Sequence, residues 1–108
     1  MLLFLVACAG PEPDPCEPMC EEAAALYGGC LEEWGLQWSD AGYEDQAHYL
    51  ESCSTWAWEL RELEAAAVER GELSRSGRVD AVCVEREELF ASGSCEDYTA
   101  INWSEPLW

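Results

Sequence analysis

The chain has 108 residues, enough for one small domain whose core can bury only a limited share of its surface. It carries 23 Asp and Glu against five Lys and Arg, which gives a net charge of −18. Such a charge excludes nucleic acid, whose phosphates need cationic contacts, and argues against peripheral binding to anionic lipid. A solvated, soluble surface accounts for this charge by itself, and any protein partner that meets it would present a cationic or apolar face.

The charges are unevenly spread, and the cysteines are numerous. All five basic residues lie between Arg61 and Arg86, whereas residues 1–60 hold 12 acids and no Arg or Lys. The chain also contains seven cysteines. A domain of this size is marginal without covalent support, and in an oxidising compartment disulfides supply that support. The composition therefore predicts a small, exported, disulfide-rich domain.

The first eight residues, MLLFLVAC, form an apolar segment that ends in a small residue and a cysteine. A bilayer span takes about 20 residues, so this segment is too short to cross a membrane. Leu5-Val6-Ala7-Cys8 resembles the lipobox of bacterial lipoprotein signal peptides. The resemblance implies that residues 1–7 are a signal peptide that is removed and that Cys8 is acylated, as by palmitate, and anchors the chain. An ordinary signal peptide followed by a chance cysteine is the alternative.

Residues 8–14 alternate proline with acid and so predict an extended tether between the lipid and the domain. Lipoprotein sorting in enteric bacteria offers a further resemblance, in which Ala9 after the cysteine implies the outer membrane. The chain also resembles the small cysteine-rich lipoproteins that some Gram-negative bacteria carry, a class that implies location rather than mechanism. We therefore expect a cell-envelope protein held to the membrane by lipid on Cys8, with its domain in the periplasm or on the cell surface.

The segment from Asp14 to Gly35 predicts the first helix of a domain that spans residues 15–108. Asp14 suits the N-cap, Pro15 the first helical position, and Glu17 the reciprocal partner of a capping box. Gly28 and Gly29 predict close packing against a neighbouring helix, and a break of the helix there is the alternative. The expected inner face repeats at steps of three and four residues and comprises Cys16, Cys20, Ala23, Tyr27, Cys30 and Trp34.

Two further helices and a tail follow. Residues 36–42 predict a connection, and residues 42–70 a second helix with Tyr43, Ala47, Leu50, Cys53, Ala57, Leu60, Leu63 and Ala67 on its inner face. Residues 78–91 predict a third helix, capped by Ser76, with Val79, Val82, Cys83, Leu89 and Phe90 inside. The aromatic tail after Gly93 is expected to be irregular and to lie across the bundle. The predicted fold is all-α: a small three-helix bundle stapled by disulfides.

Six cysteines remain after Cys8 is assigned to lipid, and they allow fifteen connectivities. In an antiparallel up-down-up bundle, cysteines at similar heights along neighbouring helices can be joined, and the remaining height differences are about 5 Å. This comparison predicts the pairs Cys16–Cys83, Cys20–Cys53 and Cys30–Cys95.

Metal and redox chemistry have little support in the sequence. Cys16 and Cys20 could hold two corners of a zinc site, but closely spaced partner ligands are missing and His48 is the one histidine. There is no C-x-x-C redox motif and no calcium-binding D-x-D-x-D-G loop. We expect no cofactor and no metal.

A hydrolase would have to be built around His48, with Ser52 or Ser54 as the nucleophile. No G-x-S-x-G or other framing motif surrounds these serines, so an enzyme or enzyme accessory is the least supported function. A solvated or packed histidine is the alternative reading of His48.

Six tryptophans are the least ordinary feature of the composition. Trp56 and Trp58 are two residues apart and point to opposite sides of a helix, so they cannot both face the core. Either the tail covers one of them, or tryptophans form an exposed recognition surface. The candidate residues of that surface are Trp38, Trp56, Trp58, Trp103 and Trp108.

The function expected from the sequence is a lipid-anchored, non-enzymatic interaction or structural module of the envelope. The alternative is a lipoprotein that binds a small ligand or a cation, which the many acids support weakly. An exposed tryptophan patch favours the first function. Converging carboxylates favour a cation site, and a hollow holding His48 with an acid favours an enzyme.

Overall fold

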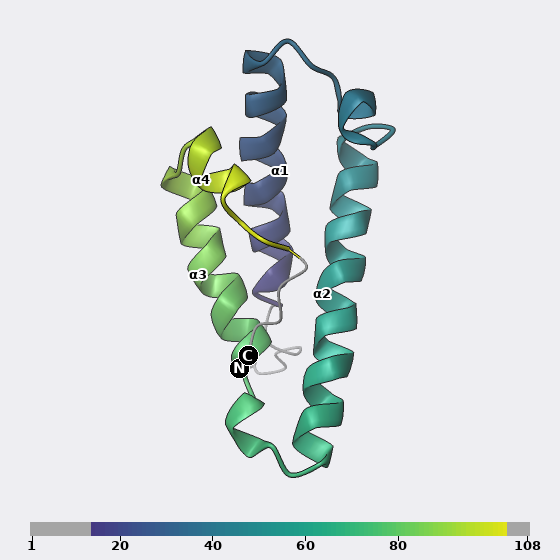
Figure 1. Cartoon of the computed structure of the whole chain (residues 1–108), viewed down its shortest axis with the longest axis vertical. Helices are drawn as coiled ribbons and strands as arrows, with labels where there is room; N and C mark the ends of the chain where they lie inside the picture. The colour runs from purple at the N-terminus through teal and green to yellow at the C-terminus, as the bar shows by residue number, and fades with distance from the viewer. Residues whose placement is uncertain (1–13, 104–108) are drawn as a thin grey trace, which may run out of the picture.

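The computed structural model describes residues 14–103 as four α-helices and two short 3-10 turns, without a strand in that range (Figure 1). The predicted all-α class is confirmed. The predicted signal peptide, the acylated Cys8 and most of the tether lie outside the described residues, as do Leu107 and Trp108. The elements are α1 (Cys16–Glu33), η2 (Trp38–Ala41), α2 (Gln46–Glu69), η3 (Leu73–Arg75), α3 (Arg78–Ser92) and α4 (Cys95–Thr99).

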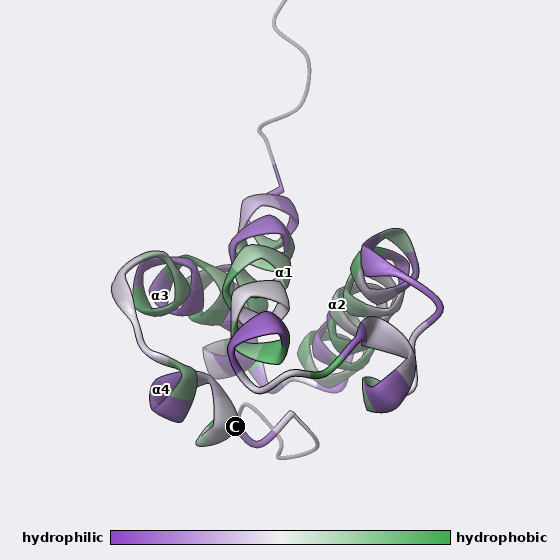
Figure 2. Cartoon of the chain, turned by 90° about the horizontal axis from the view of Figure 1, so that it is seen from above, coloured by the Kyte–Doolittle hydropathy of each residue, from purple (hydrophilic) through white to green (hydrophobic). Residues whose placement is uncertain are grey.

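Helix α1 is the centre of the domain. It lies between α3 on one side and α2 on the other, and it packs against both (Figure 1). Seen from above, α2 and α3 flank α1 on opposite sides, and α4 lies next to α3 (Figure 2). The bundle is therefore an open one, which the C-terminal segment partly covers.

The helix ends differ from the predicted ones in ways that the caps explain. Helix α1 begins at Cys16, whose N–H donates to Asp14 Oδ1 at 2.9 Å, and Pro15 occupies the N-cap. The capping box predicted with Glu17 is wrong, because proline offers no side-chain acceptor. Helix α1 ends, as predicted, before Gly35, which has a φ of +73°.

Helix α2 begins later than predicted. Gly42 adopts a left-handed φ of +94° and ends the 3-10 turn η2, so the chain cannot enter a helix there. The N-cap is Asp45 instead, and its Oδ1 accepts the N–H of His48 at 2.8 Å.

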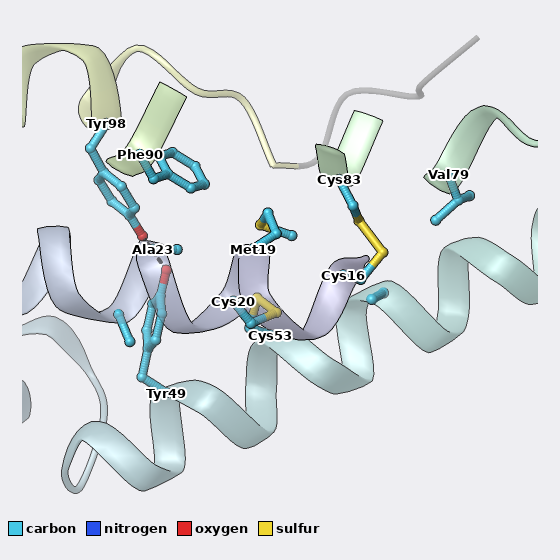
Figure 3. Close-up of a cluster of buried hydrophobic side chains, with 12 residues drawn as sticks. Cys16, Met19, Cys20, Ala23, Tyr49, Cys53, Val79, Cys83, Phe90 and Tyr98 are labelled. Atoms are coloured by element: carbon cyan, nitrogen blue, oxygen red, sulfur yellow. Dashed lines mark hydrogen bonds between the residues drawn. A yellow bond between two sulfur atoms is a disulfide. The ribbon is translucent and has the colours of Figure 1, made fainter. Parts of the chain in front are cut away.

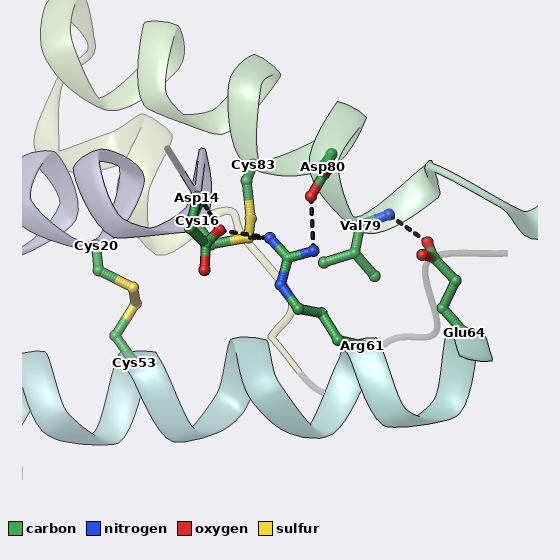
Figure 4. The surroundings of a disulfide bond; sticks show 9 residues. All are labelled: Asp14, Cys16, Cys20, Cys53, Arg61, Glu64, Val79, Asp80 and Cys83. Carbon is green, nitrogen blue, oxygen red and sulfur yellow. Dashed lines mark hydrogen bonds and ion pairs between the residues drawn. A yellow bond between two sulfur atoms is a disulfide. The ribbon is translucent and has the colours of Figure 1, made fainter. Parts of the chain in front are cut away.

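Helix α3 is capped from another helix rather than by Ser76, whose predicted role is wrong. Gly77 is the N-cap residue, with a φ of +80°. The first-turn N–H of Val79 donates at 2.8 Å to Glu64 Oε1 on α2 (Figure 4). A carboxylate at a helix N-terminus also favours the positive end of the helix dipole.

The tail is not irregular, as the sequence analysis expected, because it forms the short helix α4. Ser94 and Asp97 make a capping box: Ser94 Oγ accepts the Asp97 N–H at 3.2 Å, and Asp97 Oδ2 accepts the Ser94 N–H at 2.9 Å. The expectation that the tail lies across the bundle holds for the described residues, since Tyr98, Ile101 and Trp103 pack on the core.

The core differs from the predicted inner faces at both ends of α1 and along α2. Predicted core residues that prove exposed are Trp34, Ala47, Leu63 and Leu89. Buried residues outside the predicted faces are Ala24 and Leu31, together with Met19 and Tyr49, which Figure 3 shows. Helix α1 buries a wider face than one stripe because it has a neighbour on each flank.

Three disulfides join α1 to the other three helices, and they are the three pairs predicted from the heights of the cysteines. They are Cys16–Cys83 and Cys20–Cys53, both drawn in Figures 3 and 4, and Cys30–Cys95. Each helix that packs on α1 is thus covalently held to it.

One arginine links α1, α2 and α3 beside the first disulfide (Figure 4). Arg61 on α2 forms ion pairs with Asp14, immediately before α1, and with Asp80 on α3, the latter at 2.7 Å. Its Nη2 also lies 3.4 Å from Cys16 Sγ. Because these groups are partly exposed, water screens them and the stabilisation they give is modest.

The adjacent glycines of α1 allow a matched test of packing. A methyl group at Gly28 would lie 3.1 Å from Trp38 Cζ2, whereas one at Gly29 would meet no atom within 4 Å. The close neighbour of Gly28 is therefore the 3-10 turn η2 rather than a helix. Gly29→Ala is expected to raise the free energy of unfolding by about 0.5–1 kcal/mol. Gly28→Ala should be the less stable variant in urea denaturation, since it displaces the indole, and the reverse order would contradict this packing.

No helix within residues 14–103 has the length and apolar character needed to cross a membrane.

Candidate binding pocket

A pocket of about 420 Å³ opens where α4 and the residues after it approach α1 and α2. All four tyrosines and three of the tryptophans of the chain contribute to its wall. Among residues 14–103, no side chain that lines the wall carries a charge. The lining residues are Tyr27, Trp34, Ala41, Tyr43, Tyr49, Ser52, Cys53, Trp56, Tyr98, Thr99, Ile101 and Trp103.

Two buried tyrosines meet in the wall of the pocket. Tyr49 on α2 and Tyr98 on α4 point toward each other past Ala23 of α1, and their hydroxyl oxygens are 2.6 Å apart (Figure 3). Tyr27 stacks on Tyr98 with ring centroids 4.6 Å apart, and Tyr43 meets Tyr49 edge-on at 5.0 Å. This interlocked set fixes the positions of α2 and α4 across α1 and gives the wall a rigid aromatic surface.

The same tyrosines predict an alkaline transition. Burial raises the pKa of Tyr49 from 10.0 to about 12, and burial also raises the pKa of Tyr98. The unfolded chain thus loses these protons at lower pH than the folded chain does, so stability is complete below pH 10 and falls as the pH rises toward 12. Urea midpoints should show this decline in the wild type and a smaller one in Tyr49→Phe/Tyr98→Phe. The double change leaves neither hydroxyl without its partner, and an equal decline in both proteins would contradict the assignment.

Two tryptophans form the side of the pocket next to the C-terminal segment. The Nε1–H of Trp56 donates to the carbonyl oxygen of Trp103 at 3.0 Å, and the two rings meet edge-to-face at 4.9 Å. The guanidinium of Arg86 on α3 lies over both rings, 5.6 Å from Trp56 and 5.2 Å from Trp103. Phe90 lies behind this wall, 6.0 Å from Trp103 and 5.6 Å from Tyr98.

A shallower hollow of about 340 Å³ adjoins the pocket along α2. The two share Ser52 and Trp56, so the hollow continues the pocket over the helix surface. Its other lining residues are Thr55 and the exposed carboxylates Glu51 and Glu59. The combined site thus has an uncharged aromatic end and an acidic end.

The tryptophans of the predicted recognition surface do not lie together in the structure. Trp56 and Trp103 line the pocket, but Trp38 packs inward against Tyr27 and Tyr49 with centroids 5.6 and 5.2 Å apart. Trp58 is 61% exposed and lies apart from the pocket, as its spacing from Trp56 requires. Trp108 lies outside the described residues. The tail does cover Trp56, which was the alternative reading.

His48 belongs to the start of α2 and not to the pocket. Its Nδ1 accepts the N–H of Glu44 at 3.0 Å, and its own N–H is held by Asp45. Of the two serines considered as nucleophiles, Ser52 faces the pocket and Ser54 is exposed. His48 therefore takes part in capping α2, and it is not among the residues that line the pocket with Ser52.

Periodicity and motifs do not predict the pocket, because its lining residues come from separate segments of the chain. The predicted site residues include none of the four tyrosines, although Tyr27 and Tyr43 are predicted in the core. Among residues 14–103, no three His, Cys, Asp or Glu side chains are grouped so that they could hold a metal ion. What the wall can offer a ligand is aromatic faces and tyrosine, serine and threonine hydroxyls.

No protein-family model matches this chain, and comparisons with curated proteins and with solved structures found no significant match.

Proposed function

We propose that this chain is a lipid-anchored envelope protein that acts by binding, not by catalysis, and that the aromatic pocket is its binding site. The observation that carries the proposal is the pocket of about 420 Å³ whose wall holds all four tyrosines of the chain. This volume lies in the range of small-molecule sites, which are mostly apolar with a few placed polar groups. A long side chain of a protein partner would meet the same surface.

The disulfides support this proposal because they hold the walls of the pocket in place. Cys53 lies in the wall itself and is bonded to Cys20 of α1. Cys95, at the start of α4, is bonded to Cys30 of α1 and so fixes the helix that carries Tyr98 and Thr99. A site whose walls are fixed before binding loses less conformational entropy when a ligand enters.

Filling the pocket tests the proposal. Ser52 is half-buried and lines the pocket, so Ser52→Phe places a ring in the space that a ligand would take. Phenylbutanol, a neutral aromatic probe, is expected to bind the oxidised wild type in a saturable manner with one site. Ser52→Phe should weaken that binding at least about tenfold, or roughly 1.4 kcal/mol. The measurements are titration calorimetry and the emission of the pocket tryptophans.

Ser54→Phe is the matched control. Ser54 is two residues away on the same helix, exposed and outside the pocket, so the change adds the same ring without filling the site. Thermal unfolding of both variants checks that they are folded. Absence of saturable binding to the wild type, or equal binding by the two variants, would remove the pocket as the binding site.

The location has a separate test on the intact protein. Mass spectrometry of the membrane fraction should find a chain that begins at Cys8, carries acyl groups and takes up no alkylating reagent before reduction. Cys8→Ala should move the protein to the soluble fraction, since acyl chains supply the membrane affinity. An unacylated chain with free thiols would place it in a reducing compartment instead.

A further inference from the structure

We infer that the ligand of the pocket is an organic cation: an aromatic or apolar body that enters the pocket, joined to an amine that lies in the hollow lined by Glu51 and Glu59. This inference rests on the proposed function and adds the chemical class of the ligand. It follows from the way in which the uncharged pocket continues into the acidic hollow.

The pocket end selects the body of the ligand. Its wall presents rings of tyrosine and tryptophan at several orientations, with the Tyr27 and Tyr98 rings stacked and those of Trp56 and Trp103 edge-to-face. Such surfaces bind flat or apolar groups through stacking and burial of apolar area. Ring faces also attract cations, so a positive charge near the pocket mouth is not disfavoured.

The hollow selects the charge. Glu51 and Glu59 are eight positions apart on α2, about 12 Å along the helix axis, and Ser52, Thr55 and Trp56 lie between them. Within the part of the chain that the structure describes, no basic side chain lines either the pocket or the hollow. With the net charge of −18, these carboxylates give the open end of the site a negative potential that attracts a cation.

Arg86 is the group that could favour the opposite charge. It lies over Trp56 and Trp103 from the α3 side, while the two carboxylates approach Trp56 from α2. Its guanidinium is engaged with the two ring faces and is not part of the pocket wall. The test therefore includes an anionic probe. Tighter binding of the anion than of the amine would identify Arg86 as the residue that selects the charge of the ligand.

Three probes that share a phenylbutyl body separate the contributions of body and charge: phenylbutylamine, phenylbutanol and phenylbutyrate. Titration calorimetry on the oxidised protein should give the amine an affinity about three- to tenfold above that of the alcohol, as one or two partly exposed ion pairs provide. The anion should bind most weakly. Added salt should reduce the difference between amine and alcohol, because it screens exposed charges.

Glu51→Gln/Glu59→Gln is expected to lower the affinity for the amine to that for the alcohol and to leave the alcohol unchanged. Glu62→Gln/Glu69→Gln removes the same charge from exposed positions of α2 that line neither the pocket nor the hollow. This variant should still bind the amine more tightly than the alcohol. Equal binding of amine and alcohol by the wild type, or tighter binding of the anion, would overturn the inference while the proposed function stands. Failure of all three probes to bind would overturn both.

Discussion

A variant with alanine at all six cysteines between residues 16 and 95 is expected to be unfolded at room temperature. The three bonds close loops with sequence separations of 67, 33 and 65 residues. Constraint of the unfolded chain by loops of this size is worth about 4 kcal/mol for each bond, or about 12 kcal/mol together. Natural domains have a total stability of about 5–15 kcal/mol, so the loss is comparable with the whole. Far-UV circular dichroism and thermal unfolding measure the outcome.

Variants that lack a single disulfide should lose stability by different amounts. Cys20→Ala/Cys53→Ala opens the shortest loop, so chain entropy alone predicts the smallest loss for that pair. That bond also lies in the pocket wall, and its removal should therefore weaken binding of phenylbutanol more than its effect on stability suggests. A cooperative unfolding transition of the six-alanine variant near that of the wild type would show that packing alone holds the domain together.

Phe90→Ala is expected to lower the free energy of unfolding by about 3–5 kcal/mol, the range for loss of a buried aromatic side chain. Phe90 is a residue of α3 and is 3% exposed. Its ring packs against Tyr98 and Trp103 of the C-terminal segment. The change leaves a cavity behind the pocket wall, so the same variant should also bind phenylbutanol more weakly. Urea denaturation followed by tryptophan emission measures the first effect.

Leu89→Ala provides the contrast, because the sequence placed both residues on the inner face of the third helix. In the structure Leu89 is 36% exposed, so its truncation removes less buried surface and should lower the free energy of unfolding by only about 1 kcal/mol. Phe90→Leu, which keeps much of the volume, should cost roughly 1 kcal/mol. Similar losses for Leu89→Ala and Phe90→Ala would mean that α3 turns a different face to α1.

The parts of the fold that the sequence predicted depend on local periodicity. The cysteines of α1 recur at helical spacing, and heights along helices follow from a fixed rise per residue, so the disulfide pairs could be inferred without coordinates. The short helix α4 was also accessible, since Ser94 and Asp97 have capping-box spacing after a glycine. The glycine and serines around this motif are also typical of turns, and so they favour an irregular tail when read without the cap.

Most of the predicted stripe of α2 is confirmed, because Cys53, Ala57 and Ala67 are buried and Leu50 and Leu60 pack against the core. Two of its members, Ala47 and Leu63, are exposed, whereas Tyr49, which the stripe omits, is 4% exposed. The burial of Tyr49 comes from its contacts with Tyr27, Tyr43 and Tyr98, which lie outside α2. The pocket was inaccessible for a related reason: the contact of Tyr49 with Tyr98 joins residues 49 positions apart through tertiary packing alone.

Each of the three disulfides has one cysteine on α1, and this arrangement affects how the protein responds to proteolysis. The bond partners Cys53, Cys83 and Cys95 lie on α2, α3 and α4, so a single cut in either connection between the long helices releases no fragment. Residues 70–78 contain three of the five arginines and are the natural place for a trypsin-like enzyme to cut. A chain nicked there keeps α2 and α3 each bonded to α1, so it migrates as one species until it is reduced and can still present an intact pocket.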